Sequence, residues 1–158
     1  MYKFELQKAA DKLINEIFAV KKGEVVVITC DTLSDMGLID AVASSAYAAG
    51  GVPMTITIPT PGGVGKAADP DIPIESLTGA FLGADVWIEF NHQWLLYSTP
   101  FEIAMEKNPK LRYMCLVDFD QALLIRTVGN VETPQLQKFM TAFTKRHLTA
   151  KKMHVTTP

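Results

Sequence analysis

The sequence lacks the features typical of disulfide-rich, secreted and membrane-spanning proteins. Only two of its 158 residues are cysteine, Cys30 and Cys115. Each lies in an apolar run, so we expect buried thiols of a reduced, cytoplasmic protein and not a disulfide framework. The N-terminal residues are charged throughout, so no secretory signal is expected. No apolar stretch approaches the ~18 residues that a membrane span requires, so no membrane partner is expected.

The sequence also lacks a strong net charge. Fifteen Lys and Arg against seventeen Asp and Glu give a net charge of −2, which argues against a nucleic-acid partner. The charge is unevenly distributed: residues 1–108 contain seven basic and fourteen acidic side chains, and residues 109–158 contain eight basic and three acidic ones. A basic C-terminal end next to an acidic body indicates a docking surface.

Sequence patterns typical of catalysis are missing too. There is no HExxH, CxxC or GxSxG, no GxGxxG after a strand, and no cluster of His, Asp, Glu and Cys at metal-ligand spacing. We therefore expect no catalytic residue, metal ligand or cofactor in this chain, and we expect the chain alone to be inactive. Residues 62–66 resemble a phosphate-binding loop, but Thr60 and Ala67 replace its first glycine and its hydroxyl residue, which favours a surface loop.

What the sequence does contain is an alternation of helical and strand patterns. Apolar residues at three- and four-residue spacing predict helices, and unbroken or alternating β-branched runs predict strands. The predicted helices cover 3–20, 36–49, 74–82, 99–107, 121–127 and a segment from 133, and the predicted strands cover 24–30, 53–59, 85–90, 112–117 and 153–156. This order predicts one α/β domain over 1–158, with an open, mainly parallel sheet of about five strands and helices on both faces, a Rossmann-like three-layer arrangement.

Several segments carry more specific expectations. The strand over 53–59 is bounded by prolines and half polar, which places it near a sheet edge. Residues 60–74 are rich in proline and glycine and predict a loop. Thr99 is expected to cap the helix that follows it. The helix from 133 places five large apolar residues on one face: Leu136, Phe139, Met140, Phe143 and Leu148.

Candidate functional residues lie where predicted strands end, because ligands of parallel sheets bind at the carboxyl ends of the strands. Asp31 ends the first strand, where turn formation or helix capping explains it more simply than ligand contact. His92, Gln93 and Tyr97 follow the third strand in an aromatic, apolar loop. They are candidates for the wall of a substrate pocket, although core packing of neighbouring residues explains much of the same loop.

Two further carboxylates follow the fourth predicted strand. Asp118 and Asp120 could in principle share a hard cation, because carboxylate oxygens suit such ions. Two carboxylates alone make a weak site, however. Capping of the helix from 121 explains Asp120 without any metal.

Taken together, the residues resemble a known family. KKGEVVVITCD follows a leading helix, AAGG ends the next helix before PMTITIP, and GADVWIEFNHQWLLYSTPFEIAM leads to a basic helix and the closing KKMHVTTP. Over essentially all 158 residues, the chain resembles the N-terminal domain of the thermophilic aminopeptidases of the leucyl aminopeptidase and aminopeptidase T type. It also resembles that of their relative, 2,5-dihydroxypyridine 5,6-dioxygenase.

The resemblance implies a larger protein. In that family the segment matching MHVTTP continues into a C-terminal domain that holds divalent metal ions, so the chain is expected to be the N-terminal domain of a two-domain protein, cut before its metal-binding domain. The resemblance also implies a homo-oligomer that acts on a small-molecule or peptide substrate. The dioxygenase has a histidine at the position of Tyr97, and because a phenol is a poor base near neutrality, an aminopeptidase-like hydrolase is favoured. A dioxygenase-like enzyme and a non-catalytic binding or assembly module remain the alternatives.

Overall fold

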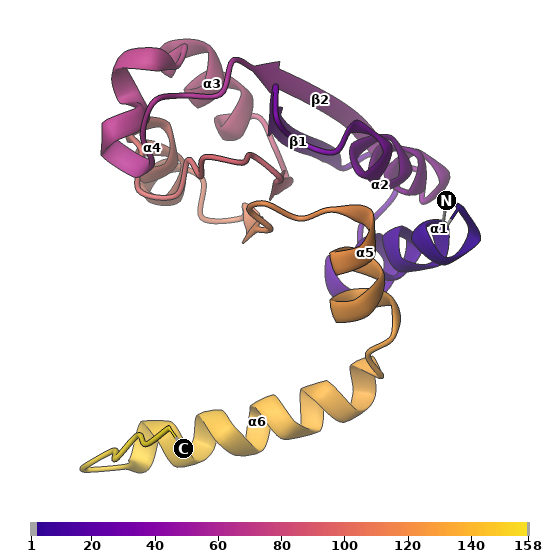
Figure 1. The fold of residues 1–158 in the computed structure, drawn as a ribbon, viewed down its shortest axis with the longest axis vertical. Helices are drawn as coiled ribbons and strands as arrows, with labels where there is room; N and C mark the ends of the chain where they lie inside the picture. The colour runs from indigo at the N-terminus through magenta and orange to yellow at the C-terminus, as the bar shows by residue number, and fades with distance from the viewer. Residues whose placement is uncertain (1–2, 158) are drawn as a thin grey trace.

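The computed structural model describes residues 3–157 and contains a four-stranded sheet in which every strand is parallel to its neighbour (Figure 1). The central strands β1 (Val25–Asp31) and β3 (Val86–Glu89) pair with each other, β2 (Val52–Ile58) pairs with β1, and β4 (Arg112–Cys115) pairs with β3. The predicted parallel α/β sheet is therefore confirmed. The proline-bounded strand β2 lies at an edge, as expected from its half-polar pattern.

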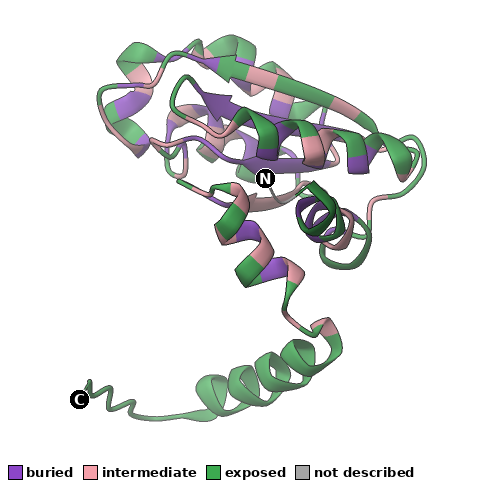
Figure 2. Ribbon diagram, turned by 45° about the vertical axis from the view of Figure 1, so that its right-hand side comes forward, coloured by how far each residue is buried: buried purple, intermediate pink, exposed green. Residues whose placement is uncertain are grey.

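Helices cover both faces of this sheet, so the predicted three-layer arrangement is confirmed (Figures 1 and 2). One face of the sheet is covered by α1 (Lys3–Lys12) with its π-helical continuation η1 (Leu13–Ile17), by α2 (Met36–Ala48), and by α5 (Gln121–Leu124) with the π-helical η3 (Ile125–Gly129). The other face is covered by the 3-10 helix η2 (Gly65–Asp71), α3 (Ile74–Leu82) and α4 (Thr99–Lys107). Within residues 3–157, no helix has the length and apolar character needed to cross a bilayer.

The side chains of β1 and β3 contribute to two hydrophobic cores, one on each face of the sheet. Alternate residues of β1 and β3 pack against α1, α2 and α5, and the residues between them face α3 and α4. Trp87 is the largest fully buried side chain on the second side. Its ring stacks on Phe81 with centroids 3.7 Å apart, and its Nε1–H donates to Thr29 Oγ1 at 2.9 Å. Because both faces are covered, β1 and β3 are mostly apolar and do not alternate between apolar and polar residues.

The predicted fifth strand over 153–156 is not formed. Residues 152–157 have no regular secondary structure and are exposed. The preceding helix α6 (Thr133–Thr149) leads the chain away from the sheet, so these residues have no strand edge to pair with (Figure 1). A β-branched pattern alone does not make a strand without a hydrogen-bonding neighbour.

Two local predictions also need correction. The loop over 60–74 contains the 3-10 helix η2, which the prolines and glycines concealed. The cap of α4 is Ser98, whose Oγ accepts from Phe101 N, one residue before the expected Thr99. Thr99 instead donates its N–H and its hydroxyl to Asp69, at 2.9 and 2.5 Å. This contact ties η2 to the start of α4.

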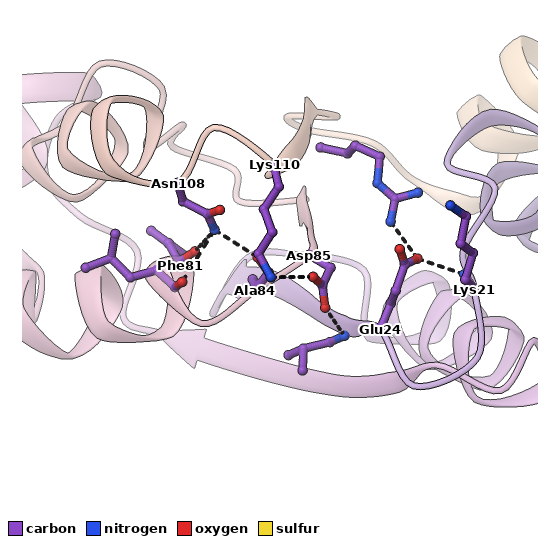
Figure 3. Close-up of polar contacts among 10 residues, drawn as sticks. Lys21, Glu24, Phe81, Ala84, Asp85, Asn108 and Lys110 are labelled. Carbon is purple, nitrogen blue, oxygen red and sulfur yellow. Dashed lines mark hydrogen bonds and ion pairs between the residues drawn. The ribbon is translucent and has the colours of Figure 1, made fainter.

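At the amino-terminal ends of the strands, carboxylate side chains form ion pairs with Lys and Arg side chains (Figure 3). Arg112 lies 2.6 Å from Glu24, and Lys110 lies 2.8 Å from Asp85. Burial alone would raise the pKa of Glu24, but the Lys21 N–H and the Arg112 guanidinium outweigh it and lower that pKa. The hydrogen bond from Lys110 lowers the pKa of Asp85. Both carboxylates are therefore held ionised near neutral pH, and they join β1, β3 and β4 at this edge.

The buried side chain of Asn108, the residue that follows α4, connects the end of α4 to the end of α3. Its Nδ2 donates to the carbonyl oxygens of Phe81 at 2.9 Å and Ala84 at 2.8 Å, where α3 ends (Figure 3). The last carbonyls of a helix have no partner within the helix, so Asn108 supplies the missing donor.

We expect Asn108→Ala to destabilise the domain by about 1–3 kcal/mol, because it leaves buried carbonyls without a donor. Urea denaturation gives the free energy of unfolding directly. The control is Asn15→Ala, which removes an exposed side chain that donates to Asp11 O at 2.8 Å within its own helix. Equal effects of the two changes would contradict the role given to Asn108.

Candidate functional site

At the carboxyl edge of the sheet, the structure brings Asp31 to the loop that follows β3. The Asp31 side chain is fully buried. Its Oδ2 accepts the backbone N–H groups of His92 at 2.7 Å and Gln93 at 3.1 Å, and its Oδ1 accepts the N–H of Leu33 at 3.0 Å. Turn formation, the simpler explanation of Asp31, is therefore what the structure contains. Through these hydrogen bonds, the same carboxylate fixes the position of the backbone at His92 and Gln93.

His92 pairs with a carboxylate from the next strand along the sheet. Its Nδ1 lies 2.7 Å from Oδ1 of Asp118, which follows β4. An ionised carboxylate can only accept, so Nδ1 carries the hydrogen and Nε2 of a neutral imidazole keeps its lone pair. The two side chains are 39% and 71% exposed, so the pair lies on an open surface. A histidine and a carboxylate in contact are the groups that a proton-transfer pair requires.

The backbone of Asp118 adopts an uncommon conformation. Its φ is +58°, in the left-handed region that residues other than glycine seldom adopt. The Asp118 N–H donates to Asn91 O at 3.3 Å, which attaches the turn after β4 to the residue before His92. Such strain clusters at ligand-binding and catalytic positions.

Tyr97, another predicted pocket residue, makes its described contacts with other residues than this pair. It is 63% exposed and its φ is +68°. Its ring packs edge-on against Phe101 with centroids 5.8 Å apart. The described contacts of Tyr97 thus connect it to α4 and η2, whereas those of His92 and Gln93 connect them to Asp31 and Asp118.

The glycines that resemble a phosphate-binding loop serve this packing. Gly65 has a φ of +56°, and a Cβ there would lie 3.0 Å from Leu96 O and 3.6 Å from the Cβ of Tyr97. Lys66 forms an ion pair with Glu102 at 2.6 Å. Residues 62–66 therefore pack against the 91–98 loop, and the last two of them begin the 3-10 helix η2 where the incomplete motif favoured a surface loop.

Sequence reasoning missed a buried carboxylate beneath the site. Glu89 ends β3 with no exposed surface and accepts hydrogen bonds from Leu95 N–H and the Tyr113 hydroxyl. Burial raises its pKa, although these two hydrogen bonds oppose the shift. Burial, reinforced by the nearby Glu89 charge, also raises the pKa of Tyr113 and brings the pKa of the Cys115 thiol to about 11. A glutamate inside the apolar run DVWIEF is the signal that could have identified it.

Asn91 is the second residue that was missed. It is fully buried directly before His92, and neither its Oδ1 nor its Nδ2 has a hydrogen-bond partner among the described residues. A buried amide without partners is costly, so such a group indicates a place where water or a ligand completes the structure. Only its position after a buried strand hinted at this in the sequence.

The site offers few ligands for a metal ion. Within residues 3–157, no group of three or more His, Cys, Asp and Glu side chains is arranged to hold one. His92 and Asp118 supply two donors, and the Asp31 oxygens are taken up by backbone N–H groups. Asp120, the other carboxylate after β4, caps α5 by accepting from Leu123 N at 2.6 Å, as predicted. By themselves, these described residues therefore do not make up a metal-binding group, and they offer hydrogen-bond donors and acceptors.

The raised pKa of Glu89 predicts how stability depends on pH. The folded protein favours the protonated form, so the contribution of Glu89 is full below its ordinary pKa of 4.5 and is lost as pH rises through the raised value. Glu89→Gln cannot ionise. Urea denaturation at several pH values gives the free energy of unfolding of both proteins. The value for Glu89→Gln minus the value for the parent should increase as the pH rises above about 4.5.

The matched control is the exposed Glu75 on α3, whose replacement by Gln should leave the pH dependence unchanged. A difference between Glu89→Gln and the parent that stays constant from acid to neutral pH would contradict the assignment.

Comparisons with known proteins bear on the fold. No protein-family model and no curated protein sequence matches the chain. Among solved structures, it is similar to 2,5-dihydroxypyridine dioxygenase from Pseudomonas putida KT2440, with a TM-score of 0.60 and 16% identity over 81% of this chain and 38% of that chain. It is also similar to wild-type AmpT from Thermus thermophilus, with a TM-score of 0.53 and 13% identity over 82% of this chain and 42% of that chain. The match thus covers less than half of either protein, and at these identities the likeness shows that the three share a fold.

Proposed function

We propose that this chain is the pocket-shaping domain of a metal-dependent enzyme, an aminopeptidase-like hydrolase that removes N-terminal residues from peptides. The observation that carries the proposal is the His92–Asp118 pair at the carboxyl edge of an all-parallel sheet. Ligands of such sheets bind at this edge. The fold shared with AmpT, and the much greater length of that protein, support the further proposal that a second domain completes the enzyme.

In this proposal, each residue of the site has a separate task. Asp31 holds the backbone of His92 and Gln93, and Asp118 holds the imidazole with Nδ1–H toward itself. Nε2 of His92 then accepts a proton from the substrate, or returns one to it. Gln93 and Tyr97 form the adjoining wall and limit access to the site. In this proposal the second domain supplies the divalent metal ion, because residues 3–157 bring together only two suitable donors at the site.

A dioxygenase-like, ring-cleaving enzyme is the second candidate. The observation that favours it is the similarity to the Pseudomonas putida protein, with its TM-score of 0.60. Against it stands Tyr97, since a phenol is a poor base near neutrality. A non-catalytic binding or assembly module is the remaining alternative, supported by the absence of a catalytic motif from the sequence.

Activity assays separate these candidates. The protein expressed from its complete reading frame should, with added divalent metal ions, hydrolyse aminoacyl anilides and leave 2,5-dihydroxypyridine intact. The 158-residue chain alone should turn over neither substrate. Cleavage of the pyridine ring would select the dioxygenase-like candidate. A reading frame that stops after residue 158, with no turnover and no bound metal, would select the binding module.

Variants of the pair test the role of His92. We expect His92→Ala to lower kcat/KM by about 100-fold, because it removes the proton acceptor. Asp118→Asn should cause a smaller loss, since its amide oxygen still accepts the Nδ1–H but without the charge. The control is Asp40→Asn on the exposed surface of α2. An unchanged kcat/KM for His92→Ala would remove His92 from the mechanism.

A further inference from the structure

The C-terminal helix α6 presents an uncovered apolar seam. None of its seventeen residues is buried, and Figure 2 shows nearly the whole helix as exposed. The seam consists of Leu136, Phe139, Met140 and Phe143, which are 43–63% exposed. Their i, i+3, i+4, i+7 spacing places all four on one face of the helix. Phe139 and Phe143 stack on each other with ring centroids 6.2 Å apart, so the seam is a continuous apolar surface.

The helix projects away from the domain that carries it (Figure 1). Its start is attached: the Thr133 hydroxyl donates to Glu16 Oε2 at 2.6 Å, and the Lys12 ammonium donates to Val131 O just before the helix. A helix gains most of its stability from the packing of its apolar face, and exposed apolar patches mark surfaces that bind a partner. The seam is therefore a binding surface.

The charge of this segment is of one sign. Residues 133–157 (the arm) contain five Lys and Arg and no Asp or Glu. Residues 3–132 (the body) contain ten basic side chains and seventeen acidic ones, so the arm has a net charge of +5 and the body a net charge of −7. A partner that complements the arm is therefore negatively charged.

The positions of the basic side chains distinguish a flat anionic surface from a groove in a protein. Lys138 and Lys145 line a shallow hollow with Gln137 and Thr141, on the side of the helix opposite the seam. A groove that held the seam would leave these two lysines without a carboxylate to contact. Basic side chains on one face and aromatic and aliphatic ones on the other are typical of helices that lie in the plane of a lipid surface.

The range of the attraction agrees with this arrangement. An amphipathic helix sinks about 5–10 Å into the boundary between headgroups and acyl chains, which brings its opposite face close to the headgroups. The field of a charged surface extends over about 8 Å at physiological salt, so Lys138 and Lys145 contribute to binding without touching the lipid.

Further basic side chains lie next to the C-terminal end of the seam. Arg146 and Lys152 line one exposed hollow together with Phe143 and Met153. Arg and Lys can lay their apolar stems along such side chains while their charged ends reach a polar layer. This end of the arm therefore suits the boundary between acyl chains and headgroups.

We propose that the arm binds anionic lipid surfaces, with its apolar seam between the headgroups and its Lys and Arg side chains attracted to acidic headgroups. A helix that lies on a bilayer needs no spanning segment, so the lack of a long apolar run, which argued against a membrane partner, does not bear on this mode. The acidic body lies away from the arm, where salt screens its repulsion from the surface. This inference does not depend on the proposed function.

Co-sedimentation of the 158-residue chain with lipid vesicles tests the proposal. Vesicles of equal parts phosphatidylcholine and phosphatidylglycerol should bind the chain at least about 10-fold more tightly than vesicles of phosphatidylcholine alone, because each basic side chain near an anionic surface strengthens binding. Added salt should weaken this binding. A chain that binds neither kind of vesicle would overturn the proposal and leave the seam to a protein partner. Equal binding to both kinds would overturn the role of the basic side chains.

A pair of double variants tests the seam. Phe139→Ser combined with Phe143→Ser should weaken binding to the mixed vesicles by about 100-fold, because two phenyl rings no longer leave water. The matched control is Gln137→Ser combined with Thr141→Ser, which introduces the same residue twice on the opposite side of the helix and should bind as the parent does. Equal losses in the two double variants would contradict the role given to the seam.

A second pair of variants tests the charge. Lys138→Gln combined with Lys145→Gln should weaken binding by about 10-fold or more, although both lysines lie away from the seam. The control, Lys8→Gln combined with Lys22→Gln, removes two exposed charges from the body and should change binding little. Undiminished binding by the variant of Lys138 and Lys145 would overturn the arrangement on a charged surface.

Tryptophan fluorescence shows which face of the helix enters the lipid. Brominated acyl chains should quench the fluorescence that Phe143→Trp adds to that of the parent, and they should not quench the fluorescence that Thr141→Trp adds. Quenching at position 141 and not at 143 would contradict the proposed orientation. Because the substituted residues are exposed in the single chain, the variants should fold, and circular dichroism checks that they do.

Discussion

The buried carboxylate of Asp31 is the contact on which the site depends. It has no Lys or Arg beside it among the described residues; backbone N–H groups and the Ser34 hydroxyl surround it instead. These donors come from the turn after β1 and the loop after β3, so one side chain sets the relative position of both. His92 stands on that loop, and Asp118 reaches it from the end of β4. The free Nε2 of His92 thus follows from where Asp31 places the backbone.

The two ends of the parallel strands differ in how their carboxylates are paired. At the amino edge, Glu24 and Asp85 pair with Arg112 and Lys110, and both acid pKa values are lowered. At the carboxyl edge, Glu89 is buried without a cation and its pKa is raised, while the amide of Asn91 has no partner in the described chain. Buried polar groups of this kind lower stability, and natural proteins keep such groups chiefly at functional sites.

Local sequence patterns predicted the strands, whereas contacts between residues far apart in the sequence were not predicted. Apolar and β-branched runs identified the four strands of residues 3–157, and the prolines of β2 identified an edge strand. A fifth strand was expected over 153–156, but a strand needs a neighbour, which the direction of α6 denies it. His92 was singled out from its position after a strand. Asp118 was noted as a carboxylate after the fourth strand, but its contact with His92 was not predicted, because that contact depends on β4 lying beside β3. Glu89 was missed because its partner Tyr113 lies on another strand.

The protonation of His92 tests the central claim most directly. Long-range ¹H–¹⁵N correlation spectra of the chain report which imidazole nitrogen carries the hydrogen, and with only three histidines the assignment is tractable. The account predicts that neutral His92 carries its hydrogen on Nδ1, directed at Asp118, and that this preference weakens in Asp118→Asn. A hydrogen on Nε2 in the parent chain, or spectra that Asp118→Asn leaves unchanged, would contradict it.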